Sequence, residues 1–191
     1  MKHQAGWKKF RWLSVAALVV MLLALTQPVF AGSKAAEIDK QVDLALEQLY
    51  NSTPAAREIA KVAKAVLVFP SIIKAGLVVG GQYGEGALRV NGKTVGYYNT
   101  VAASYGLQIG AQSFGFAMFF MNDKALEYLN KSGGWEVGVG PTIVVVDKGA
   151  AKTLTTSTAK DDIYAFCFNQ KGLMAGLGLQ GSKITRIHPD K

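Results

Sequence analysis

The chain has 191 residues, of which 50% are hydrophobic and 18% charged, with 21 glycines. This length and apolar content fit one domain with a sizeable core and exclude a wholly disordered protein. The single cysteine, Cys167, excludes an intrachain disulfide framework and a cysteine-based zinc site. The two histidines, His3 and His188, lie near opposite ends of the chain, so we expect no metal, no cofactor and no catalytic triad.

The formal charge of +8 is concentrated at the N-terminus. Residues 1–31 hold four cations, Lys2, Lys8, Lys9 and Arg11, and no acidic residue. Removing these four leaves 17 basic against 13 acidic residues, a formal charge of +4. Such a mild bias does not predict nucleic-acid binding.

Residues 1–31 have the pattern of a cleaved secretory signal peptide. The four cations precede the apolar run 12–25, and residues 29–31 (VFA) form a cleavage site before Gly32. The alternative is a membrane anchor, but the run is shorter than the ~20 residues that a spanning helix needs. We expect an exported protein, periplasmic or associated with the cell envelope, whose single domain covers residues 32–191.

Two helices are predicted at the start of this domain. Apolar residues recur every three or four positions over residues 35–50, as on one face of a helix. A second helix is expected from Pro54, at a first helical position, to about Ala65, with Ile59, Val62 and Val66 on one face. Its cations Arg57, Lys61 and Lys64 fall on the opposite face and form either a solvated surface or a binding patch.

The remaining chain predicts strands, with Asn91-Gly92 as a hairpin turn. Residues 66–69 are expected to form a strand stopped by Pro70, followed by one helical turn over 71–76. One further helix is predicted over residues 124–131, capped by Asn122 or Asp123. The other strands are expected at residues 77–79, 87–90, 94–100, 104–111, 114–121, 135–141, 142–146, 163–169 and 173–180, with a polar surface loop over 148–160.

Glycines two residues apart suggest strand faces without side chains. The pairs are Gly84/Gly86, Gly138/Gly140 and Gly176/Gly178. Such faces allow tight curvature or the close approach of another backbone. The expected fold class is α+β: two N-terminal helices packed on a strongly curved, glycine-rich antiparallel sheet or partial barrel, with one further helix.

Motifs that would indicate an enzyme are weak or absent from the sequence. Residues 176–181 (GLGLQG) match a dinucleotide fingerprint, but only ten residues follow, too few to complete a βαβ unit. Cys167 lies in an apolar strand pattern that is typical of a buried structural thiol. Glu85, between two glycines, has no evident acid or base partner, so an enzyme that uses it is the weakest alternative.

From about residue 60 to residue 187 the chain resembles the SYLF-domain family. The resemblance is carried by residues 63–70 (AKAVLVFP), 74–86 (KAGLVVGGQYGEG), 105–112 (YGLQIGAQ), 121–126 (MNDKAL), 138–141 (GVGP) and 171–176 (KGLMAG). It implies a non-catalytic module that binds acidic phospholipids; some yeast members of the family also bind actin. Actin is not an expected partner of an exported protein, and the family supplies no catalytic residues.

We therefore expect a lipid-binding or membrane-surface module. The expected lipid-binding residues are the cations Arg57, Lys61, Lys64 and Lys74 and the apolar residues Phe69, Ile72 and Ile73. The cations would meet headgroup phosphates and the apolar residues would supply hydrophobic contact. The alternative is a structural or interaction domain that binds another protein of the cell envelope.

The signal pattern predicts the N-terminus of the exported protein. Cleavage after Ala31 leaves a mature chain that begins Gly32-Ser33-Lys34. N-terminal sequencing of protein recovered from its native compartment checks this. An intact Met1 on stably membrane-integrated protein would show that the segment is an anchor.

Overall fold

A computed structural model describes residues 33–76, 79–105, 110–131, 134–146, 151, 154–172 and 181–190. The predicted signal peptide, the strand over 173–180 and residues 176–180 of the glycine motif lie outside the described residues, as do Leu77 and Val78 of the predicted strand 77–79.

The first predicted helix is confirmed as α2 (Lys34–Ser52). Its buried side chains Ile38, Val42, Ala45 and Leu49 are three or four residues apart, so they form one stripe against the sheet. Ser33 caps the helix by accepting a hydrogen bond from the Ala36 amide at 3.2 Å.

The second helix is shorter than predicted, because α3 (Pro54–Ala60) ends before the strand begins. Ile59 is buried as expected, whereas Val62 is exposed and Val66 belongs to a strand. The Lys64 amide donates to the Phe120 carbonyl at 2.8 Å. The helix therefore ends where the backbone begins to pair with the sheet, although apolar residues at helical spacing continue in the sequence.

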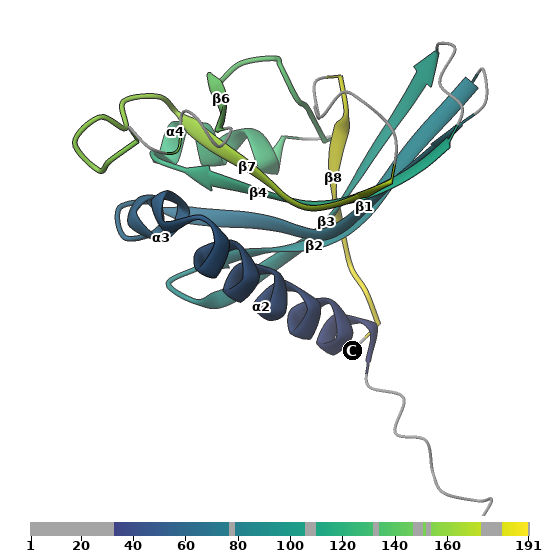
Figure 1. The fold of residues 1–191 in the computed structure, drawn as a ribbon, viewed down its shortest axis with the longest axis horizontal. Coiled ribbons are helices and arrows are strands. Elements are labelled where there is room, and N and C mark those ends of the chain that lie inside the picture. Colours follow the sequence, from purple (N-terminus) through teal and green to yellow (C-terminus); the bar gives the residue numbers. More distant parts are fainter. Residues whose placement is uncertain are drawn as a thin grey trace, which may run out of the picture. The chain divides into compact units, whose positions relative to one another are not determined.

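The described residues form eight strands of one sheet, in the order β5-β8-β3-β2-β1-β4-β7-β6 (Figure 1). All neighbours are antiparallel except β6 and β7. The strands are β1 (Ala65–Gly76), β2 (Val79–Val90), β3 (Lys93–Tyr105), β4 (Gly110–Phe120), β5 (Trp135–Glu136), β6 (Ile143–Val146), β7 (Ile163–Gly172) and β8 (Lys183–Ile187). With α2 and α3 packed on this sheet, the predicted fold class is confirmed.

Several predicted boundaries differ from the observed ones. The expected strand 104–111 is divided between the end of β3 and the start of β4, and β8 was not predicted. The further helix is α4 (Asp123–Glu127), continued by the 3-10 turn η1 (Tyr128–Asn130). Asn122 caps α4 as predicted, accepting from the Ala125 amide at 2.8 Å.

Pro70 does not stop the strand, and residues 71–76 are not helical. β1 runs through Pro70, and its ladders with both β2 and β4 shift register at this point. Proline has no amide hydrogen to donate, so it is tolerated inside a sheet where a bulge interrupts the pairing. Pro70 marks a bulge within β1, so its interpretation as the end of a strand was wrong.

The glycine pairs have different roles. A Cβ on Gly86 would lie 2.0 Å from the Val68 carbonyl oxygen at the bulge, so the predicted close approach is confirmed there. Gly138 and Gly140 instead lie in a turn with φ of 104° and 97°, because the predicted strand 135–141 is reduced to β5. The turn at Asn91-Gly92 is confirmed, with φ of 50° and 76° and β2 paired antiparallel to β3.

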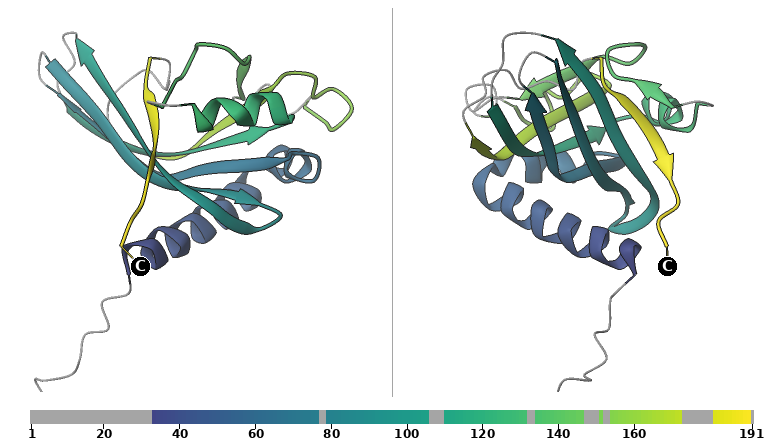
Figure 2. Two further views of the ribbon diagram at one scale, coloured as in Figure 1. Left: turned by 180° about the vertical axis from the view of Figure 1, so that it is seen from behind. Right: turned by 90° about the vertical axis from the view of Figure 1, so that its right-hand side faces the viewer.

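The sheet curls strongly, as the two views in Figure 2 show. Four strands separate β4 from β5 in the sheet order, yet the rings of Phe120 and Trp135 are 6.2 Å apart. The concave face, with α4 and η1, encloses one hydrophobic core, and α2 and α3 enclose a second on the convex face. The domain's ends meet where the Ala35 amide donates to the Asp190 carbonyl at 3.2 Å.

The close approach at Gly86 predicts a sharp difference between two glycines of β2. Gly86→Ala should cost about 3 kcal/mol of unfolding free energy, because the new methyl group meets backbone that cannot move aside. Gly81→Ala should be nearly neutral, since its Cβ would lie 3.7 Å from the nearest atom. Urea denaturation of both variants measures the two values. Equal costs would contradict the proposed constraint.

Candidate functional site

The predicted cations of the second helix lie at the end of α3 and beyond it, each beside a polar partner. Arg57 donates to the Asn51 side-chain oxygen at 3.2 Å. Lys61 pairs with Glu58 at 2.6 Å, and Lys64 lies 3.9 Å from an Asp123 carboxylate oxygen. All three are exposed, so these contacts contribute little stability and leave the cations accessible.

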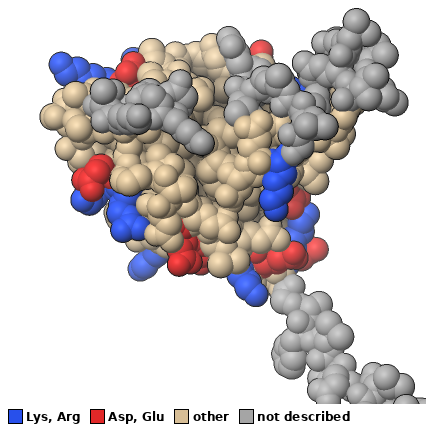
Figure 3. Space-filling view, viewed as in Figure 1, with Lys and Arg blue, Asp and Glu red and all other residues tan. Residues whose placement is uncertain are grey.

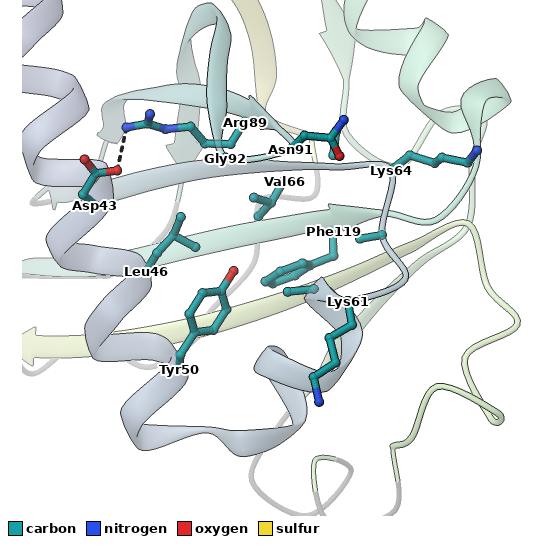
Figure 4. Close-up of a pocket in the computed structure, with 13 residues that line it drawn as sticks. Asp43, Leu46, Tyr50, Lys61, Lys64, Val66, Arg89, Asn91, Gly92 and Phe119 are labelled. Atoms are coloured by element: carbon teal, nitrogen blue, oxygen red, sulfur yellow. Dashed lines mark hydrogen bonds and ion pairs between the residues drawn. The ribbon is translucent and has the colours of Figure 1, made fainter.

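Lys61 and Lys64, but not Arg57, line a groove of about 320 Å³ between the helices and the sheet. Its apolar lining includes Leu46, Tyr50 and Phe119. Figure 4 shows these side chains gathered in the groove, while the Lys61 and Lys64 side chains point away from it. The groove therefore offers an apolar surface with charge only at its edge.

The third cation of the groove, Arg89, is neutralised by α2. Its guanidinium lies 2.8 Å from Asp43 and 3.4 Å from Asp39. Asp39 also accepts hydrogen bonds from Thr94 at 2.6 Å and from Tyr97 at 2.9 Å. This cluster ties α2 to β2 and β3, and we assign it a structural role.

The four expected site residues of β1 do not share a surface. Phe69 and Ile72 are fully buried in the concave core, so they cannot supply the expected contact with a membrane. Ile73 is exposed on the convex face, and Lys74, the next residue, points to the concave face with Ile72. The prediction failed here because it assumed a helical turn over residues 71–76.

The convex face of β1–β3 carries an apolar patch that the sequence analysis missed. Cross-strand pairing aligns Val101, Tyr83 and Ile73, and Val79 lies on the same face of β2, four residues from Tyr83. Their exposed fractions are 46%, 48%, 58% and 60%. Small residues fill the rows between and beside them, namely Ala75, Gly81, Ala103 and Ala111. We call the four large residues and these four small ones the apolar patch.

Lysines stand at both sides of the apolar patch. Val101 pairs with Lys183 of β8, and Ser113, the neighbour of Ile73, pairs with Lys171 of β7. Both lysines are exposed, and neither forms an ion pair among the described residues. In Figure 1, strands β1–β3 extend beyond α2, so none of the described helices covers this end of the convex face.

Glu85 marks the boundary between α2 and the apolar patch. It accepts hydrogen bonds from the Lys34 ammonium at 2.8 Å and the Tyr83 hydroxyl at 2.5 Å. Burial alone would raise the pKa of this carboxyl, but the hydrogen bonds from Lys34 and Tyr83 hold it below its ordinary value of 4.5. With these partners Glu85 is a hydrogen-bond acceptor, and the alternative of a catalytic acid gains no support.

Cys167 is half-buried and packs against the concave core, and burial raises the pKa of its thiol to about 11. Such a thiol is protonated at neutral pH and is a poor nucleophile. The described residues include no group of three or more side chains arranged to hold a metal ion. They also include no helix long and apolar enough to cross a membrane.

The Glu85 ion pair predicts a pH-dependent contribution to stability. Because its folded-state pKa is lowered, the stability that Glu85 adds is present at neutral pH and lost as the pH falls through the range below 4.5. Glu85→Gln should therefore unfold at lower urea than the native chain at pH 7, with the difference shrinking toward pH 3. Glu47→Gln, an exposed glutamate of α2, is the matched control. A difference independent of pH would contradict the role of this ion pair.

Comparison with known proteins identifies part of the chain. Residues 101–188 match the family model described as Ysc84, Las17-binding protein actin regulator. No curated protein matches the chain. The matched segment covers the last five residues of β3 and all of β4–β8, and it overlaps the region whose sequence resembles SYLF domains. The chain therefore contains a domain of the Ysc84 (SYLF) family over residues 101–188.

Proposed function

We propose that this SYLF domain is an exported, non-catalytic module that binds anionic phospholipid at a membrane surface. The observation that carries the proposal is the uncovered apolar patch with Lys171 and Lys183 at its two sides. The resemblance to SYLF domains supports the choice of lipid, and the signal-like residues 1–31 support export.

The size of the apolar patch favours a membrane over a large protein partner. Four half-exposed large side chains present on the order of 400 Å² of apolar surface, as much as a functional patch on a monomer usually has. A standard protein interface needs about 800 Å² per partner. A shallow patch of this size can still enter the lipid headgroup region, where apolar burial is favourable.

The charge distribution favours contact through this patch over general electrostatic attraction. In Figure 3, acidic and basic side chains alternate along the edge formed by α2, so no single-sign field covers this face. Each lysine near an anionic surface contributes up to about 1 kcal/mol. Lys171 and Lys183 would therefore orient the apolar patch toward anionic lipid and add modestly to its affinity.

Two other interpretations remain as outcomes of the test. The cations Arg57, Lys61 and Lys64, expected from the sequence to bind headgroups, lie at the opposite end of α2 from Glu85. The family description names Las17 binding and actin regulation, which favours a protein partner for the family; for an exported chain that partner would be an envelope protein.

Vesicle sedimentation separates these interpretations. The domain should sediment with phosphatidylglycerol vesicles and not with phosphatidylcholine vesicles, less so as salt rises, because the Debye length falls to ~3 Å at 1 M. The double variant Ile73→Thr/Tyr83→Thr replaces two large side chains of the apolar patch with smaller polar ones. It should reduce binding at least about tenfold. Lys171→Gln/Lys183→Gln should weaken it less and reduce its salt dependence.

The controls identify the surface in use. Lys40→Gln removes one exposed cation of α2 that belongs to neither candidate surface and should bind like the native chain. If Lys61→Gln/Lys64→Gln abolishes binding while the apolar-patch variants keep it, the helix-end cations are the site and the proposal is wrong. A native chain that ignores every vesicle would favour an envelope protein partner.

A further inference from the structure

The concave face of the sheet contains a polar row directly behind the apolar patch. Cross-strand pairing places Lys74 of β1 between Gln82 of β2 and Gln112 of β4. Residues directly opposite each other in neighbouring strands have Cβ atoms about 4.5–5.5 Å apart, so the three side chains are neighbours. The adjacent row of this face contains Ile72 and Phe114, both in the hydrophobic core. We call Gln82, Lys74 and Gln112 the polar row.

Gln112 is buried without a hydrogen-bond partner. It is 2% exposed, and neither its side-chain oxygen nor its nitrogen has a partner. Gln82, equally part of the row, donates to the Ser182 hydroxyl at 2.9 Å. Burying an unpaired amide is unfavourable, and a folded protein rarely keeps one without a role.

Lys74 brings a positive charge to the same place. It is half-buried, has an amide side chain on each side, and forms no ion pair among the described residues. The next row toward the strand ends is formed by Gly76, Gly80 and Gly110, which have no side chains to cover the ammonium group. A cation beside an unpaired amide, with only glycines in the next row of the sheet, is suited to bind an anion.

We propose that Lys74 and Gln112 bind a phosphate ester that carries a neighbouring hydroxyl, with Gln82 as the third wall of the site. The phosphate oxygens accept from the Lys74 ammonium and the Gln112 amide nitrogen, and the hydroxyl donates to the Gln112 oxygen. Glycerol phosphate has this chemistry, whether in a phosphatidylglycerol headgroup or as a soluble ester. Only the choice of a lipid headgroup as the source of this phosphate ester rests on the proposed function.

Titration without vesicles tests this site separately from the apolar patch. The probes are dihexanoyl phosphatidylglycerol below its micelle concentration, glycerol 3-phosphate, and dihexanoyl phosphatidylcholine, followed by calorimetry and amide chemical shifts. The phosphatidylglycerol should bind and shift the amides of β1 and β4, and the phosphatidylcholine should bind at least about tenfold more weakly. Comparable binding of glycerol 3-phosphate would support the site and identify its ligand as a soluble ester.

Two variants decide which side chains are responsible. Lys74→Gln and Gln112→Met should each weaken binding about tenfold or more, the loss expected for one charge-assisted hydrogen bond. Gln112→Met should also raise the melting temperature of the free protein, because it removes an unpaired buried amide. Lys93→Gln, at an exposed hairpin lysine, is the control and should change neither binding nor the melting temperature.

The proposal fails if none of the three probes binds, or if both variants bind like the native chain. It also fails if Gln112→Met lowers the melting temperature and leaves binding intact, since the amide would then be structural. Vesicle binding by a chain that binds none of the soluble probes would leave the apolar patch supported and remove the polar row.

Discussion

The fold depends on one contact between two central strands, where Gly86 of β2 meets the Val68 carbonyl of β1. No side chain other than hydrogen fits there, and both ladders of β1 shift register within the next residues, around Pro70. Because β1 lies near the middle of the sheet, a bend at this point reorients the strands on both sides. The curl brings Trp135 of β5 against Phe120 of β4 and closes the concave core.

The same constraint defines what must be present for the domain to fold. The family match begins within β3, yet β1 and β2 lie between β3 and β4 in the sheet. A fragment that started at residue 101 would lack two central strands and the bulge. It would also lack Asp39, which ties α2 to Arg89 of β2 and to Thr94 and Tyr97 of β3. The matched segment is therefore part of a unit that includes α2, β1 and β2.

Short sequence patterns correctly predicted the elements whose structure depends only on residues close together in the chain. The apolar stripe of α2, the cap at Asn122 and the turn at Asn91-Gly92 depend on neighbouring residues and were correct. Pro70 was misinterpreted because its tolerance depends on a register shift with two other strands. That error placed Ile72 and Ile73 on one helical turn, although alternation along β1 sends them to opposite faces. The apolar patch and the polar row depend on cross-strand pairing, which no local pattern reveals.

The uncovered end of the sheet reverses the usual distribution of polar and apolar residues. In an ordinary sheet the enclosed face is apolar and the outer face polar. Beyond Glu85 the outer face has Ile73 and Tyr83, whereas the enclosed face has Lys74 and Gln112. Exposing the apolar outer face to water is unfavourable, and so is burying the polar enclosed face against packed hydrocarbon. An apolar medium outside and an anionic, hydroxyl-bearing group inside would satisfy both, and anionic lipid is one chemistry that supplies the two together.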